Sequence, residues 1–218
     1  MRLRNVKNKF AILTTSKYVI DNNKVSKGNW RQEFGNDNLI HAEIGMGKGD
    51  FIIGMAQKNP NVNFIGIEKY SSVLAKASQK IENLELENIR LLNIDANNFE
   101  EYFCKEIARI YLNFSDPWPK NAHAKRRLTS SKLLSCYDKA FINNADIWMK
   151  TDNQALFEYS LESLSKYGYE LSNISLNLHA SNIKDNVITE YEERFVKENK
   201  PIFRLEAIKY IQKLKNLI

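Results

Sequence analysis

A glycine-rich loop lies between a short apolar run and a helix-like stretch, and this junction constrains the fold most strongly. Residues 39–44 form the apolar run, Gly45, Gly47 and Gly49 follow at alternate positions, and residues 51–59 have helical character. Glycine adopts positive φ freely and has no Cβ, so such a loop turns sharply and lets a ligand approach the backbone. The order of strand, glycine loop and helix predicts an α/β fold with a ligand site at the loop, with Asp50 capping the helix.

Apolar runs alternate with helix-like stretches along most of the chain, a pattern typical of a parallel sheet with connecting helices. The carboxyl ends of parallel strands meet at one edge of such a sheet, and ligands bind there. The predicted strands are residues 39–44, 62–67, 89–94, 110–114 and 147–152, and the predicted helices are residues 51–59, 70–83 with Ser71 or Ser72 as cap, 126–143 and 154–167.

The alternation of strands and helices changes after Gly168. Residues 169–178 and 202–211 are predicted to be extended strands, and a helix capped by Thr189 is predicted between them. No internal repeat or low-complexity linker divides this region from the preceding one. We therefore expect one α/β domain over residues 39–218, preceded by a basic N-terminal arm, residues 1–38.

Asp116 lies in the segment SDPWPK, directly after the apolar run at residues 110–114. Pro117 and Pro119 flank Trp118, and two prolines so close together cannot continue a central strand or lie inside a helix. The segment is predicted to be a stiff loop that holds Asp116 at the ligand-binding edge of the sheet. Taken separately, the Asp-Pro pair also suits a simple turn and Trp118 a core position. Their position together favours a functional site.

Other acids at this edge are candidates for binding a nucleoside-containing cofactor. Glu43 is an acid within an apolar strand, where a cationic ligand would offset the cost of its burial. Glu68 ends the second predicted strand about 20 residues beyond the glycines, a position suited to ribose hydroxyls. Asp95 and the nearby Asn97 follow the third strand, where Asp95 either contacts an adenine amino group or caps the next helix.

The positive charge is concentrated in two parts of the chain. Residues 1–38 contain eight Lys and Arg against three acids, and residues 109–132 contain six against one, whereas the net charge of the whole chain is +6. Clustered positive charge is typical of proteins that bind polyanions. No apolar run reaches the roughly 18 residues of a membrane helix and no signal peptide begins the chain, so we expect a cytoplasmic protein without membrane contact. Two widely spaced cysteines predict neither a disulfide framework nor a metal site.

The motifs taken in order resemble the bacterial tRNA (guanine-N7-)-methyltransferase family, over residues 39–210. They are EIGMGKGDF, Glu68, Asp95, the segment FSDPWPK with the following His and KRRL, Thr151-Asp152, and Thr189-x-Tyr191-Glu192. The glycine loop is common to Rossmann-like methyltransferases, whereas the DPWPK and TxYE segments are specific. The resemblance implies a seven-stranded α/β methyltransferase sheet, mostly parallel with antiparallel last strands and helices on both faces. It implies methylation of a guanine in the tRNA variable loop by S-adenosyl-L-methionine.

The resemblance also implies roles for individual residues, with Asp116 at the catalytic centre and no metal. Between the DPWPK segment and its histidine, where the family usually has basic residues, this chain has Asn121 and Ala122. The implied cofactor contacts are Glu43, Gly45, Gly47, Gly49, Glu68, Asp95, Asn97 and Asp116; the implied substrate contacts are Lys120, Asp152, Thr189, Glu190, Tyr191 and Glu192; the implied RNA contacts are Ala122, His123, Ala124, Lys125, Arg126 and Arg127.

Three alternatives stay open on the sequence. An amino-methyltransferase acting on an exocyclic base nitrogen has a similar loop, but there a second proline directly follows the first, whereas here Trp118 does. A non-catalytic RNA-binding protein could keep the same fold. A nicotinamide-dependent oxidoreductase is disfavoured, because Asp50 occupies the third glycine position of GxGxxG. The sequence is compatible with either a monomer or a homodimer.

Overall fold

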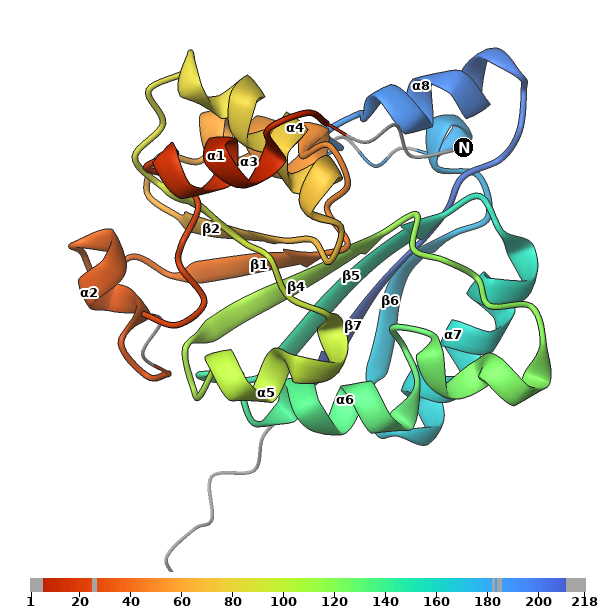
Figure 1. Ribbon diagram of the computed structural model, residues 1–218. Coiled ribbons are helices and arrows are strands. Elements are labelled where there is room, and N and C mark those ends of the chain that lie inside the picture. The colour runs from red at the N-terminus through yellow and green to blue at the C-terminus, as the bar shows by residue number, and fades with distance from the viewer. Residues whose placement is uncertain (1–5, 25–26, 182, 184–185, 211–218) are drawn as a thin grey trace, which may run out of the picture.

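The computed structural model describes residues 6–24, 27–181, 183 and 186–210, and it forms one seven-stranded sheet with helices on both faces (Figure 1). The strand order is β3-β2-β1-β4-β5-β7-β6. The strands are β1 (Ile40–Ile44), β2 (Asn63–Ile67), β3 (Ile89–Leu92), β4 (Ile107–Asn113), β5 (Ala145–Thr151), β6 (Glu170–Ser175) and β7 (Phe203–Lys209).

Strands β1 to β5 pair in parallel, whereas β7 pairs antiparallel with both β5 and β6. The predicted fold class is therefore confirmed, including the change of pattern after Gly168. Some strand ends differ from the predictions, for example in β3, which ends at Leu92 rather than at residue 94, and in β6, which ends at Ser175 rather than at residue 178. The predicted end of the last strand at residue 211 lies outside the described residues.

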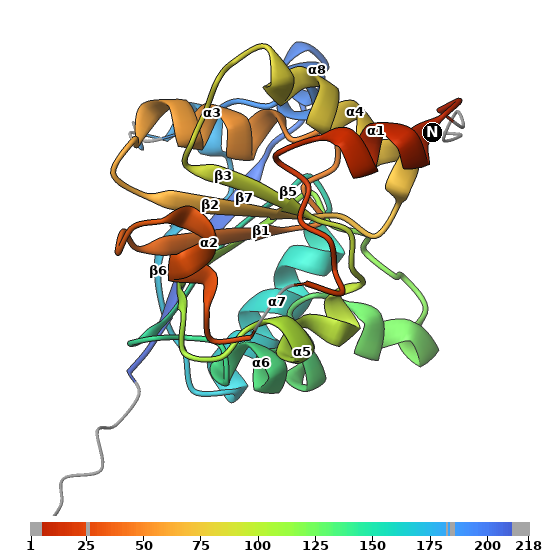
Figure 2. The same ribbon diagram turned by 60° about the vertical axis from the view of Figure 1, so that its left-hand side comes forward.

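The helices form two layers (Figures 1 and 2), with α1, α3 and α4 on one face of the sheet and α5, α6 and α7 on the other. Each layer encloses a hydrophobic core, one containing Ile52 and Leu74 and the other containing Leu134 and Phe157. The helices are α1 (Lys9–Thr15), α2 (Trp30–Phe34), α3 (Asp50–Lys58), α4 (Ser71–Glu82), α5 (Phe99–Tyr102), α6 (Ser131–Asp138), α7 (Gln154–Lys166) and α8 (Glu190–Lys197), with 3₁₀ turns η1 (Ala96–Asn98), η2 (Asn121–Arg126) and η3 (Leu178–Ala180).

The described part of the N-terminal arm packs onto this domain. The amide of Leu91 in β3 donates to the Tyr18 carbonyl over 2.7 Å, and the amide of Ile20 donates back to the Leu91 carbonyl over 2.9 Å. Trp30 is 1% exposed, and its indole N–H donates to the Tyr102 carbonyl. Burial of these aromatic rings joins the arm to the core of the sheet. The boundary at residue 38 stays a prediction.

Three predicted helix starts are wrong. Gly49, at φ 81°, is the N-cap of α3, and Asp50 is instead the first helical residue, paired with Lys80 of α4. Tyr70 is the N-cap of α4, and Ser71 donates to the side chain of Asn93. The helix predicted over 126–143 is the shorter α6 (Ser131–Asp138), because residues 127–130 form a turn between η2 and this helix. In the described part of the chain, no helix is long and apolar enough to cross a membrane.

Candidate active site

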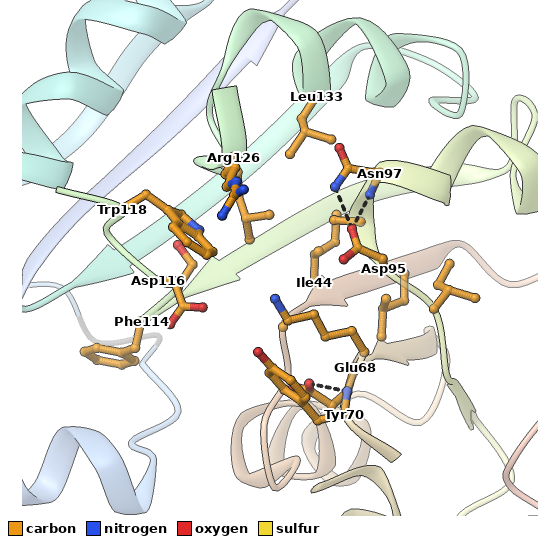
Figure 3. Close-up of a pocket in the computed structure, with 17 residues that line it drawn as sticks. Ile44, Glu68, Tyr70, Asp95, Asn97, Phe114, Asp116, Trp118, Arg126 and Leu133 are labelled. Atoms are coloured by element: carbon orange, nitrogen blue, oxygen red, sulfur yellow. Dashed lines mark hydrogen bonds between the residues drawn. The ribbon is translucent and has the colours of Figure 1, made fainter. Parts of the chain in front are cut away.

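A pocket of about 350 Å³ opens where β1, β2, β3 and β4 end, the edge predicted from the strand and acid pattern (Figure 3). Its volume lies within the range of small-molecule sites in proteins. Asp116 and Trp118 lie on one side of it and Asp95 and Asn97 on the other. The predicted cofactor residues that line it are Gly45, Glu68, Asp95, Asn97 and Asp116, whereas Glu43, Gly47 and Gly49 do not.

The glycine loop leaves its backbone open at the pocket. Gly45 has φ 77°, and a Cβ placed on it meets no protein atom within 4 Å. Gly47 turns its amide toward Glu68, whose Oε2 accepts over 3.2 Å. Gly49 serves close packing instead, since a Cβ there would lie 3.3 Å from Ala77. A ligand in the pocket can therefore approach the backbone at Gly45 without meeting a side chain.

Glu68 is almost buried at the end of β2, and two backbone amides hold its carboxylate. Tyr70 donates to Oε1 over 2.9 Å and Gly47 donates to Oε2 over 3.2 Å. Burial raises the pKa of Glu68, whereas these two hydrogen bonds act to lower it. The carboxylate thus ties the glycine loop to the second strand and lines the pocket.

Asp95 caps a short helical turn, so the cap predicted for it is confirmed. Its Oδ1 accepts from the backbone amide of Asn97 over 2.9 Å and from the Asn97 side chain over 2.7 Å. Partial burial acts to raise the pKa of Asp95, but the two hydrogen bonds from Asn97 outweigh it and lower the pKa. Asp95 and Asn97 both line the pocket, and the adenine contact stays a prediction.

Glu43 lies behind the pocket rather than in its wall. Its Oε1 accepts from the Asn113 side chain over 2.8 Å, and its Oε2 has no hydrogen-bond partner among the described residues. Burial raises the pKa of Glu43 to about 8, although Asn113 and the charge of Lys150 act to lower it. A carboxyl group with this pKa is largely protonated at neutral pH.

The raised pKa of Glu43 predicts how stability depends on pH. The folded protein binds this proton more tightly than the unfolded chain, whose carboxyl keeps the ordinary value of 4.5. The stability that protonated Glu43 contributes to the fold is therefore complete below pH 4.5, and it is lost as the pH rises through about 8. Glu43→Gln, which keeps the shape without the titration, should gain melting temperature relative to the wild type as pH rises from about 5 to about 8.5. A difference in melting temperature between the two proteins that does not change with pH would contradict the raised pKa of Glu43.

The loop that carries Asp116 has an unusual backbone. Phe114 and Trp118 adopt positive φ, at 49° and 43°, although neither is glycine. The buried Arg127 side chain donates to the carbonyls of Pro117 and Trp118, with Nη2 3.0 Å from the Trp118 oxygen. Such strained residues persist where surrounding contacts hold them. Asp116 itself is exposed to the pocket, and no donor among the described residues is hydrogen-bonded to its carboxylate.

Two cationic side chains from distant segments of the chain lie close to the Trp118 ring. Lys69 lies 5.9 Å and Arg126 4.9 Å from the ring centroid, and the His123 ring meets it edge-on. These are cation–π distances. Lys69 and Tyr70 also line the pocket, and the sequence analysis did not single them out. Their position directly after Glu68 was the available signal.

The residues predicted to contact RNA differ in how exposed they are. Ala122, Lys125 and Arg126 of η2 are exposed, whereas His123 and Ala124 are half-buried. Lys120, which was predicted as a substrate contact, is also exposed, directly before η2. Arg127 differs, because it is 9% exposed, holds the Trp118 loop and stacks on Tyr159 at 4.3 Å. Its guanidinium thus makes contacts inside the protein, and the RNA contact of Arg127 stays a prediction.

Two of the predicted substrate residues, Tyr191 and Asp152, lie near the Asp116 loop and belong to other segments of the chain. The Tyr191 ring lies 5.1 Å from Phe114, and burial together with the charges of Asp152 and Asp116 raises the pKa of Tyr191. Thr189 caps α8 by accepting from the Glu192 amide over 3.0 Å, as predicted. The side chain of Glu190 lies outside the described residues.

Glu192 faces into the protein rather than into the pocket. It is 0% exposed, and Lys150, Asn186 and His179 all contact its carboxylate. Burial lowers the pKa of Lys150, while Glu192 acts to raise it. The sequence analysis missed Lys150, whose position two residues before Asp152 was the available signal.

The sequence matches known methyltransferases over most of its length. The profile of a family described as "Putative methyltransferase" matches residues 37–205. A relative from Geobacillus sp. (strain WCH70), named tRNA (guanine-N(7)-)-methyltransferase, is 52% identical over 214 residues, which cover 96% of each chain. A relative of the same name from Bacillus subtilis (strain 168) is 52% identical over 190 residues, covering 87% of this chain and 89% of the relative.

Solved structures support the fold alone, because their sequence identities are low. "Structure of an Antibiotic Related Methyltransferase" superposes with a TM-score of 0.65 at 18% identity, covering 90% of this chain and 98% of the other. The 16S rRNA methyltransferase KamB superposes with a TM-score of 0.64 at 13% identity, covering 87% and 95%. With the family match and the close relatives, these findings show that the chain belongs to the tRNA (guanine-N(7)-)-methyltransferase family.

Proposed function

We propose that this protein transfers a methyl group from S-adenosyl-L-methionine to N7 of a guanine in the tRNA variable loop, producing 7-methylguanosine. The observation that carries the proposal is the position of Asp116, which faces the same pocket as Gly45 and Glu68. A cofactor site and an exposed carboxylate on a rigid loop thus share one cavity at the ligand-binding edge of the sheet.

The residues of the pocket fit the cofactor. The open backbone at Gly45 admits a ligand where a Cβ would otherwise project, and the Glu68 carboxylate is held in place to accept from ribose hydroxyls. Asp95 and Asn97 would line the adenine side. When bound, S-adenosyl-L-methionine supplies an electrophilic methyl group on a sulfonium centre.

Asp116 has two roles in the proposed reaction. Guanine N7 carries an in-plane lone pair at neutral pH, so the site needs no general base and must mainly orient the purine. The Asp116 carboxylate would accept hydrogen bonds from the guanine N1–H and amino group. It also places negative potential where the purine becomes cationic, and a carboxylate held in advance by a rigid loop stabilises that charge without reorganising.

The surroundings of Asp116 suit an extruded base on a phosphate backbone. Trp118 lines the pocket with an aromatic side chain, and the charges of Asp116 and Asp152 both act on nearby Tyr191. Lys120, Lys125 and Arg126 would contact phosphates, which position the RNA without reading its sequence. The proposal includes a cytoplasmic location, where bacterial tRNA is found, and it is compatible with either a monomer or a homodimer.

The decisive experiment is methyl transfer from labelled S-adenosyl-L-methionine to tRNA that lacks the modification, with the product nucleoside identified by mass spectrometry. We expect 7-methylguanosine in the variable loop, located by chemical cleavage. Another methylated base would favour an amino-methyltransferase. Absence of both transfer and cofactor binding in calorimetry would favour a non-catalytic RNA-binding protein.

The exposed cations beside η2 predict a salt-dependent contribution to tRNA binding. Lys125→Gln combined with Arg126→Gln should weaken tRNA binding at low salt and reduce the slope of log affinity against log salt by about one to two, since each phosphate contact releases counterions. Filter binding over a range of salt concentrations measures both effects. The matched control is Lys58→Gln with Lys166→Gln, two exposed lysines at the opposite edge of the sheet. If both double variants show the same salt dependence of tRNA binding, Lys125 and Arg126 do not contact the tRNA.

A further inference from the structure

A buried ionic cluster joins β5 to α8 beneath the proposed guanine site. The ammonium group of Lys150 lies 2.7 Å from Glu192 Oε2, and it also donates to Asn186 Oδ1 over 2.9 Å and to the Val187 carbonyl over 3.1 Å. Its three N–H donors are therefore all used. Asn186 and His179 contact the other Glu192 oxygen at 2.6 and 3.1 Å.

Both oxygens of Glu192 are thus occupied by protein partners, and the side chain is 0% exposed. Its carboxylate presents no surface to a ligand in this structure. A direct contact with guanine would require the Glu192 side chain to move out of this cluster, which would leave the buried ammonium group of Lys150 without its charged partner. The substrate contact that the family resemblance implies for Glu192 is therefore in conflict with its position.

Lys150 connects the cluster to the loop that carries Asp116. Its backbone carbonyl accepts from the amide of Phe114 over 2.8 Å, two residues before Asp116. Its ammonium group lies 5.9 Å from the Phe114 ring, and that ring packs against Tyr191 in the first turn of α8. One residue of β5 therefore contacts both the end of β4 and the start of α8.

We propose that Lys150 and Glu192 are positioning residues of the methyl-transfer site, and this inference rests on the proposed function. Their ion pair holds the first turn of α8, and with it Thr189 and Tyr191, against the Asp116 loop. Glu192 acts on the guanine through the placement of these neighbours and does not touch it. The cofactor side of the site does not depend on the pair, since neither residue lines the pocket.

A double-mutant cycle separates positioning from direct contact. Lys150→Met and Glu192→Met should each lower kcat/KM for tRNA by about 100-fold, because each leaves the other buried charge without its ion-pair partner. The double variant replaces the pair by two apolar chains of similar volume, so we expect kcat/KM within about 10-fold of the wild type. A double variant as impaired as Glu192→Met would overturn the proposal, as would a Lys150→Met variant with normal activity. Glu193→Met, the same change on the exposed face of α8, is the control.

Hydrogen exchange of the protein without tRNA provides a second measurement that does not require activity. The amides of α8 should exchange faster in Lys150→Met than in the wild type and should regain protection in the double variant. Cofactor binding, followed by calorimetry, should stay near the wild-type value in the double variant. Unchanged exchange in Lys150→Met, or loss of cofactor binding in the double variant, would overturn the proposal. A wild type that protects α8 but transfers no methyl group to tRNA would instead contradict the proposed function.

Discussion

Asp116→Ala is expected to lower kcat for tRNA methylation by about 100-fold or more, the usual cost of removing one preorganised electrostatic contact from a transition state. The tRNA dissociation constant should change much less, because in the proposed complex the cations beside η2, and not this carboxylate, contact the phosphates. The loop itself should survive the change, since Arg127 holds it through the carbonyls of Pro117 and Trp118. Single-turnover kinetics with saturating cofactor, together with tRNA binding measured separately, give both quantities.

Asp116→Asn refines this experiment, because the amide keeps the shape and loses the negative charge. If Asp116 accelerates the reaction mainly through its negative charge, the Asp116→Asn variant should recover little of the rate lost in Asp116→Ala. If Asp116 acts mainly through hydrogen bonds to the guanine, the Asp116→Asn variant should recover part of that rate. Asp37→Ala, at an exposed aspartate in the N-terminal region, is the control. An unchanged rate in Asp116→Ala would remove this residue from the mechanism.

Glu68→Ala is expected to weaken the binding of S-adenosyl-L-methionine by about 100-fold, in line with the loss of hydrogen bonds to a charged group. The change removes the proposed ribose acceptor, and it also frees the amides of Gly47 and Tyr70, so the glycine loop loses its tie to β2. Calorimetric titration of the cofactor measures the effect directly. At saturating cofactor, the rate of methyl transfer should recover toward the wild-type value, because the role proposed for Glu68 is to bind the cofactor without acting on the reacting atoms.

Glu101→Ala is the matched control, since Glu101 is an exposed acid on α5 and does not line the pocket. An unaltered dissociation constant in Glu68→Ala would show that the ribose is bound elsewhere. A loss of rate that saturating cofactor does not restore would indicate that Glu68 also orients the methyl group.

The sheet edge and its acids could be predicted from local sequence. Gly45, Glu68, Asp95 and Asp116 each follow an apolar run closely, and all four line one pocket. The physical reason is that parallel strands must all end at the same edge, so a residue's position relative to its own strand already places it. Thr189 was predictable for a different local reason, because its hydroxyl accepts from the amide of Glu192, three residues later.

Tertiary contacts decided which of the neighbouring charged residues stay exposed and which are bound inside the protein. Arg126 and Arg127 are adjacent and chemically identical, yet one lies over Trp118 and the other is buried beneath its carbonyl. Glu192 belongs to a motif associated with substrate, yet Lys150, 42 residues earlier in the chain, occupies its carboxylate. Such pairings depend on how distant segments pack, and burial of one charge requires a particular partner of opposite charge. Strand and cap patterns carry no information about that partner, so only the folded chain shows it.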